Sequence, residues 1–160
     1  MSCNACTRPR DSGSVQIRHF LPIAAAAAAV LALAPPGVAS GNADSVTVRK
    51  SAYGTILFDG RGRALYAFTR DAGKRSRCYG ACAKSWPPYL VSGRVRARAG
   101  AKGSLLGTTR RADGRRQVTY AGRPVYFYVG DRKPGQVLCQ NVGEFGGVWL
   151  VLRPSGKLVR

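Results

Sequence analysis

The chain has 160 residues and a formal net charge of +19 at pH 7, with 26 Lys or Arg against seven Asp or Glu. This length suffices for one domain and a targeting segment. The only histidine, His19, and the only methionine, Met1, both lie before residue 41. Residues 41–160 therefore exclude Ser-His-Asp and Cys-His catalysis, as well as metal sites with His or Met ligands.

The first 40 residues have the pattern of a secretory signal peptide. Basic residues within 2–18 precede an apolar run over 20–34, which ends at the Pro-Pro-Gly of 35–37. We expect a signal helix in residues 1–40 and cleavage at about residues 39–44. An uncleaved anchor is the alternative, but a membrane span needs about 20 apolar residues and this run is shorter. No later segment could span a membrane after cleavage.

The first half of the remaining chain has the pattern of short strands. A linker and a first strand are expected within 41–51, followed by apolar, aromatic-rich runs at 54–58 and 64–69. The Gly-rich connection between these two runs predicts a β-hairpin. Residues 72–77 are expected to form a loop, and residues 78–86 a short helical turn.

The second half repeats this plan, with strands expected at 105–110, 117–120, 124–129, 147–152 and 157–159 and a loop at 130–145. Asp-Gly and Pro-Ser-Gly turns separate several of these runs. The last two runs are expected to pair as a hairpin. The pattern predicts a mainly β fold, a small antiparallel domain resembling a sandwich or barrel, with about seven to nine short strands and at most one or two short helical turns.

One motif occurs twice, at an offset of 60 residues. Gly62–Asp71 aligns with Gly122–Asp131, both copies read Tyr-x-aromatic-x-x-Asp, and a tryptophan follows each. The motif residues are Tyr66, Phe68, Asp71 and Trp86 in the first copy, and Tyr126, Tyr128, Asp131 and Trp149 in the second. We therefore expect a two-repeat β domain over 52–152, with repeats at about 52–92 and 104–152 and a C-terminal strand or tail at 153–160.

The motif has two interpretations. Residues i and i+2 of a strand share a face, so each aromatic pair would supply a large apolar area to a core. Each Asp comes where its strand ends, where a carboxylate can accept backbone N–H bonds and hold a turn. This favours a duplicated core motif. The alternative is that the eight residues line a ligand site with pseudo-two-fold symmetry.

At these residues the chain resembles the bacterial secreted repeat family, whose members are also described as predicted lipoproteins and carry the same Tyr-x-aromatic-x-x-Asp motif. The matching segments are Tyr66–Asp71, Cys78–Pro88, Tyr120–Asp131, Lys133–Gln136 and Gly147–Trp149. The resemblance covers roughly residues 52–152 and implies export and a fold rather than a reaction. The chain departs from the lipoprotein pattern because no cysteine directly follows its apolar run.

Three cysteines follow residue 40, and disulfides are expected outside the cytoplasm. A bond between Cys78 and Cys82 is the first expectation, because a turn containing Gly80 can bring their Cβ atoms together. The next is Cys139 bonded to one of them, which would close a longer loop. The odd count leaves one thiol free or intermolecular. No metal site is expected, since the spacing is not Cys-x-x-Cys and no fourth ligand is present.

Residues 41–160 keep 23 of the Lys and Arg residues and only six of the Asp and Glu residues. This excess favours anionic envelope polymers or lipid headgroups as partners, with no specific nucleic acid, because no binding motif is present. Solubility in an arginine-rich coding background is the alternative. The sequence thus predicts an exported, non-enzymatic binding or structural module, secreted or in the envelope, without a cofactor. The alternative function is a thiol redox protein or an enzyme that uses Asp71, Asp131 or Glu144.

Overall fold

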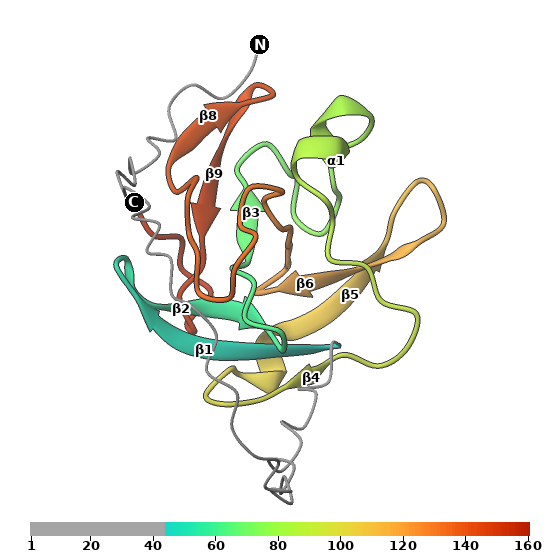
Figure 1. Ribbon diagram of the computed structural model, residues 1–160. Helices are drawn as coiled ribbons and strands as arrows, with labels where there is room; N and C mark the ends of the chain where they lie inside the picture. The colour runs from blue at the N-terminus through green and yellow to red at the C-terminus, as the bar shows by residue number, and fades with distance from the viewer. Residues whose placement is uncertain (1–43) are drawn as a thin grey trace, which may run out of the picture. The chain divides into compact units, whose positions relative to one another are not determined.

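The computed structural model describes residues 44–160, drawn in colour in Figure 1. The chain divides into two units, Met1–Ala39 and Ser40–Arg160, and the described residues belong to the second. The expected signal helix and nearly all of its cleavage zone lie outside them. Within residues 44–160, every helix is too short or too polar to cross a membrane.

The described part of the chain contains nine short strands, one short α-helix and one 3-10 helix (Figure 1). The strands are β1 (Ser45–Ser51), β2 (Gly54–Asp59), β3 (Tyr66–Phe68), β4 (Arg96–Ala97), β5 (Leu106–Arg110), β6 (Arg116–Tyr120), β7 (Arg123–Pro124), β8 (Val142–Glu144) and β9 (Gly147–Val151). The helices are α1 (Ala81–Ser85) and the 3-10 turn Gly103–Leu105. The prediction of a mainly β fold with short strands and one or two helical turns is confirmed.

The strands form three sheets of three strands each, in the orders β2-β1-β4, β3-β9-β8 and β5-β6-β7. All pairs are antiparallel except β1 with β4, where Ser45 pairs with Arg96 and Val46 with Ala97. β4 therefore lies at a sheet edge and carries part of the basic stretch 94–102. Basic side chains at such an edge discourage pairing with other chains.

The predicted hairpin between 54–58 and 64–69 is present but short. Phe58 bridges Ala64, the Asp59 N–H donates to Arg63 O, and the Leu65 N–H donates to Leu57 O. Asp59 Oδ1 holds the turn between the runs by accepting the backbone N–H groups of Arg61 and Arg63. The longer ladder of β2 is with β1, across a turn at Ala52-Tyr53, and beyond Leu65 the chain pairs as β3 with β9.

One expectation for the C-terminal half also needs correction. The segment 130–145, expected to be a loop, contains β8, which pairs with β9. The last predicted hairpin is present in a short form: Leu152 bridges Leu158, the Arg153 N–H donates to Lys157 O, and the Val159 N–H donates to Val151 O.

Both halves of the sequence contribute to one apolar core. Val46, Leu57 and Leu65 from the first half have no exposed surface, and the same holds for Val118 and Leu152 from the second. These residues belong to a single cluster of packed side chains. The two repeats are therefore parts of one hydrophobic core.

Candidate functional site

The two copies of the motif meet at their tyrosines. The backbone N–H of Tyr66 donates to the carbonyl of Tyr126, and the N–H of Tyr126 donates to the carbonyl of Tyr66, both at 2.9 Å. The two residues form an antiparallel bridge between β3 and the second copy. Equivalent residues that bond each other reciprocally define a pseudo-two-fold axis between them.

Each tyrosine hydroxyl donates to the aspartate of the other copy. Tyr66 Oη lies 2.7 Å from Asp131 Oδ2, and Tyr126 Oη lies 2.8 Å from Asp71 Oδ2. The second oxygen of each carboxylate accepts a backbone N–H from its own loop, that of Arg77 for Asp71 at 2.7 Å. For Asp131 the donor is Leu138 at 3.0 Å. Each Asp thus holds its own loop and the tyrosine of the other repeat at once.

Backbone pairing also joins each tyrosine segment to the other repeat. In β3, Phe68 pairs with Trp149 of β9. In the second copy, Tyr126 bridges Pro88, and Phe127 N–H donates to Pro87 O at 2.9 Å, directly after Trp86. Each tyrosine segment therefore pairs with the tryptophan segment of the other repeat. The two repeats interlock, and neither has all of its partners within its own sequence.

The motif aromatics form a ladder of rings in the interior. Trp86 and Trp149 stack at 4.1 Å with an interplanar angle of 1°. Phe68 stacks on Trp149 at 4.2 Å, and Tyr128 packs against Trp86 at 4.8 Å. Tyr66 meets the Trp86 ring edge-on, as Tyr126 meets Trp149. The structure thus brings all eight motif residues together, and the two tryptophans have no exposed surface.

The pseudo-symmetry fails at the indole N–H groups. Trp86 Nε1 donates to Glu144 Oε2 at 2.8 Å, and Glu144 stands five residues before Trp149. Ala81 stands five residues before Trp86 and has no side-chain acceptor. Accordingly, Trp149 Nε1 is buried without an acceptor among residues 44–160.

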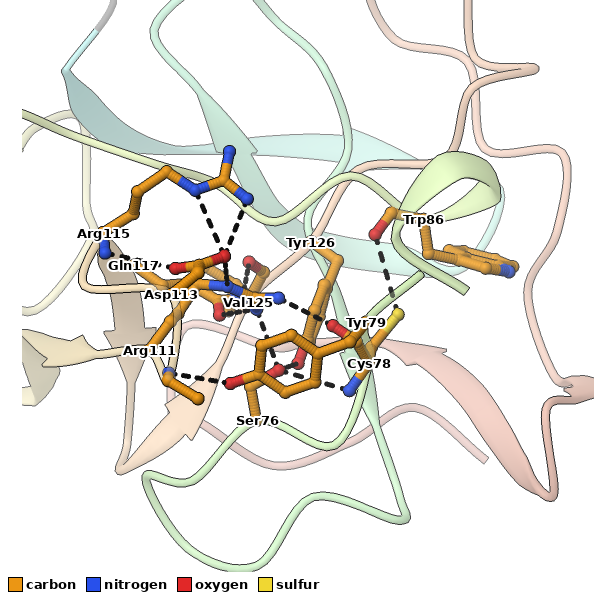
Figure 2. A network of polar contacts seen from close by, with 11 residues as sticks. Ser76, Cys78, Tyr79, Trp86, Arg111, Asp113, Arg115, Gln117, Val125 and Tyr126 are labelled. Atoms are coloured by element: carbon orange, nitrogen blue, oxygen red, sulfur yellow. Dashed lines mark hydrogen bonds and ion pairs between the residues drawn. The ribbon is translucent and has the colours of Figure 1, made fainter. Parts of the chain in front are cut away.

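A buried cation, Arg111, links the two repeats beside the ring ladder (Figure 2). Its side chain donates to Ser76 Oγ at 2.8 Å, Gln117 Oε1 at 2.6 Å and Cys78 O at 2.7 Å. The guanidinium also lies 4.3 Å from the centre of the Tyr79 ring. The whole residue is only 4% exposed. Arg111 therefore fastens the loop of the first repeat to the β5–β6 hairpin of the second.

The Arg111 network continues to the motif itself. Tyr126 Oη lies 2.8 Å from both Asp71 Oδ2 and Ser76 Oγ. A tyrosine has one hydroxyl proton; once it is donated to the carboxylate, Tyr126 must accept from Ser76. Donors then run in one direction from Arg111 through Ser76 and Tyr126 to Asp71. A cation at one end and a carboxylate at the other strengthen every bond in this chain.

Sequence reasoning missed Arg111 and Ser76. Arg111 is one of 26 basic residues, and nothing in its composition or spacing separates it from the exposed arginines on either side. The available signal was a weak one. An arginine two residues before the aspartate of an Asp-Gly turn can bond that aspartate, as Arg111 Nε does with Asp113 at 3.4 Å.

The cysteines follow the first expectation. Cys78 and Cys82 form a disulfide with their Cα atoms 5.3 Å apart, and both are buried. This bond excludes a pairing of Cys139 with either of them. Cys139 is also buried and is itself disulfide-bonded, so the expectation that the odd count leaves it as a free thiol is wrong. Among residues 44–160, no group of three or more His, Cys, Asp or Glu side chains is arranged to hold a metal ion.

Burial raises the pKa of Asp59, Asp71 and Asp131 above the ordinary value, although hydrogen bonds from backbone and tyrosine groups act in the opposite direction. Burial likewise raises the pKa of Tyr66 and Tyr126, which stay protonated donors at any physiological pH. The three aspartates therefore bind protons more tightly in the folded chain than in the unfolded one.

This difference predicts a pH dependence of opposite sign to ordinary acid denaturation. Stabilisation from a raised carboxyl pKa is complete below the unfolded value of about 3.9 and is lost as the pH rises through the folded value. We expect the Tm to increase as the pH is lowered from neutrality towards about 4. Thermal unfolding, followed by circular dichroism at constant ionic strength, measures this change of Tm with pH. A Tm that falls steadily over this range would contradict the prediction.

Asp113 supplies the control for this pH dependence. Its hydrogen bonds from Arg115 lower its pKa to about 2, so Asp113 is ionised in the folded chain throughout this pH range. Since an unfolded Asp also stays ionised above about pH 5, Asp113→Asn should leave the slope of Tm against pH unchanged between about pH 5 and 7.

The carboxylates considered for catalysis accept hydrogen bonds from groups of the protein itself. Both oxygens of Asp71 and both oxygens of Asp131 accept hydrogen bonds from protein donors. Glu144 accepts the indole N–H of Trp86. Their chemistry in this structure is that of acceptors which position loops, tyrosines and an indole.

The chain matches a family model described as a secreted repeat of unknown function, over residues 47–89 and 107–153, together more than half of the chain. No curated protein and no solved structure matches it. The two matched segments contain the two halves of the interlocked arrangement described above.

Proposed function

Because the chain belongs to the family of secreted repeats of unknown function, we propose that it is an exported, non-enzymatic module that binds an anionic polymer of the cell envelope or the extracellular space. Residues 1–40 act as its signal peptide. The family description supports the exported location. The binding function rests on the distribution of charge over the described residues.

The charge distribution is uneven because the acidic side chains are bonded to groups within the fold. Residues 44–160 contain six of them, and five are engaged within the fold: Asp59, Asp71, Asp113, Asp131 and Glu144. The ion pairs within the described part of the chain all involve Asp113. Most of the 23 basic residues that follow residue 40 therefore face solvent without a compensating charge.

Solubility alone does not require such an excess. A small soluble domain is served by a net charge of about 2–8 with both signs interspersed. An uncompensated basic surface attracts polyanions and accelerates their association. Two further observations speak against the enzymatic alternative: the buried carboxylates are saturated with donors, and the Cys78–Cys82 disulfide is itself buried.

Retention of the exported protein on immobilised polyphosphate, polygalacturonate and neutral dextran tests this function. We expect retention on both polyanions, falling at least about tenfold between low and high salt because exposed charges are screened beyond about 10 Å at 0.1 M. Dextran should retain none. Equal retention on dextran, or no retention on either polyanion at low salt, would leave a structural role instead.

A further inference from the structure

The hollows on the described surface point to where such a polymer would lie. Four of them adjoin along the β5–β6 hairpin and the segment 90–97 that leads into β4; the largest has a volume of about 620 Å³. Arg116 lines three of them, while Arg94 and Leu106 each line two. Because neighbouring hollows have lining residues in common, we treat the four together as one groove. The segment that follows α1 lies against β6, where Leu90 bridges Gln117 and the Val91 N–H donates to Arg116 O, and Figure 1 shows that it continues into β4.

The lining of this groove is basic and contains no acidic residue; its charged members are Arg94, Arg96, Arg110, Arg115 and Arg116. Arg115 is bound to Asp113 at 2.7 Å. The other four are exposed and make no ion pair within the described part of the chain. Hydroxyl groups of Ser92, Thr108 and Thr109 line the same hollows and can donate to an anion. We call this surface the arginine groove.

One pair in the arginine groove is unfavourable without a ligand. Arg110 and Arg116 lie directly opposite each other on β5 and β6. Like charges at opposed positions of an antiparallel pair destabilise it. Among residues 44–160, Arg116 Nη2 reaches only the Thr108 hydroxyl, at 3.3 Å. An anion between the two guanidinium groups would remove the repulsion and could be bound by both, since a guanidinium matches phosphate and carboxylate geometry.

The arrangement extends well beyond a single anion. Arg94 and Arg96 line the end of the groove next to β4, whereas Arg110 and Arg116 line the end next to Gly114. We propose that the arginine groove is the binding site for a linear polyanion, whose successive phosphate or carboxylate groups contact these four arginines. This proposal rests on the proposed function and specifies its site.

The test compares two variants that lose the same charge. In the groove variant, Arg94, Arg96, Arg110 and Arg116 are all changed to Gln. In the control variant, Arg49, Lys50, Arg132 and Lys133, which are exposed and line none of the four hollows, are changed to Gln. Affinities for long-chain polyphosphate and for polygalacturonate are measured on the whole exported protein, and circular dichroism confirms that both variants fold.

We expect the groove variant to bind polymer about tenfold or more weakly, since each exposed charge contact is modest and four are lost. The control variant should lose less than about threefold, through long-range screening alone. Inorganic phosphate, at the phosphate concentration of the polymer, should not compete.

Equal losses in the two variants would overturn the arginine groove and leave the proposed function standing. Competition by inorganic phosphate at matched concentration would show a single-anion site, and tighter binding to phosphatidylglycerol vesicles than to either polymer would show a lipid surface. Either result would contradict the proposal that a linear polyanion binds in the arginine groove. Failure of the unaltered protein to bind any polyanion would instead remove the proposed function.

Discussion

Replacing Trp149 by alanine should lower the free energy of unfolding by about 3–5 kcal/mol, the range for truncating a buried aromatic residue. The Trp149 side chain has no exposed surface and packs against Phe68, Trp86 and Tyr126. Its loss would leave a cavity at the contact between the repeats. Because native domains are stable by only about 5–15 kcal/mol, the variant should lose a large share of its stability.

Urea denaturation followed by far-ultraviolet circular dichroism measures this effect without relying on tryptophan emission. Val129→Ala is the matched control, because Val129 lies just after the second motif tyrosine but is 48% exposed. Its effect should stay within about 0.5 kcal/mol. A Trp149→Ala variant as stable as this control would show that the ring ladder does not hold the repeats together.

Arg111→Ala should cost about 3–5 kcal/mol, as expected when one member of a buried charged network is removed. The variant deprives Ser76 Oγ, Gln117 Oε1 and Cys78 O of their donor in the interior. It also removes the cation from the chain of donors that ends at Asp71. Arg111→Lys keeps the charge but lacks the planar guanidinium, so it cannot reach all three acceptors. Its free energy of unfolding should lie between those of the unaltered protein and Arg111→Ala.

Arg110→Ala provides the control for Arg111. The two arginines are adjacent, yet Arg110 is exposed and Arg111 is buried. Arg110→Ala should change the free energy of unfolding by no more than about 0.5 kcal/mol. If both variants lost the same stability in urea, the polar network of Figure 2 would not contribute as described.

The reciprocal contacts explain why the motif occurs twice. Tyr66 needs Asp131, Tyr126 needs Asp71, and each tyrosine segment needs the tryptophan segment of the other repeat. A single copy would expose a half-built ring ladder and carboxylates without their tyrosine donors. The pair is thus the smallest unit in which both tyrosines and both aspartates of the motif find their partners.

Local features of this protein could be predicted from the sequence because they depend on neighbours in the chain. Short alternating runs and turn residues indicated the strand segments, and Gly80 between Cys78 and Cys82 indicated the disulfide. The two aligned motifs indicated a duplicated unit. Even the role of each Asp as a holder of its own loop followed from its place at the end of a strand.

What only the tertiary structure decided is the choice of partner. Within one copy, Tyr66 and Asp71 look like natural partners, but the chain turns between them and the hydroxyl reaches Asp131 instead. Arg110 and Arg111 have the same side chain and nearly the same sequence environment, yet one lines the arginine groove and the other is buried. Composition records how many charges a chain has, whereas burial and pairing depend on which distant segments pack against each one.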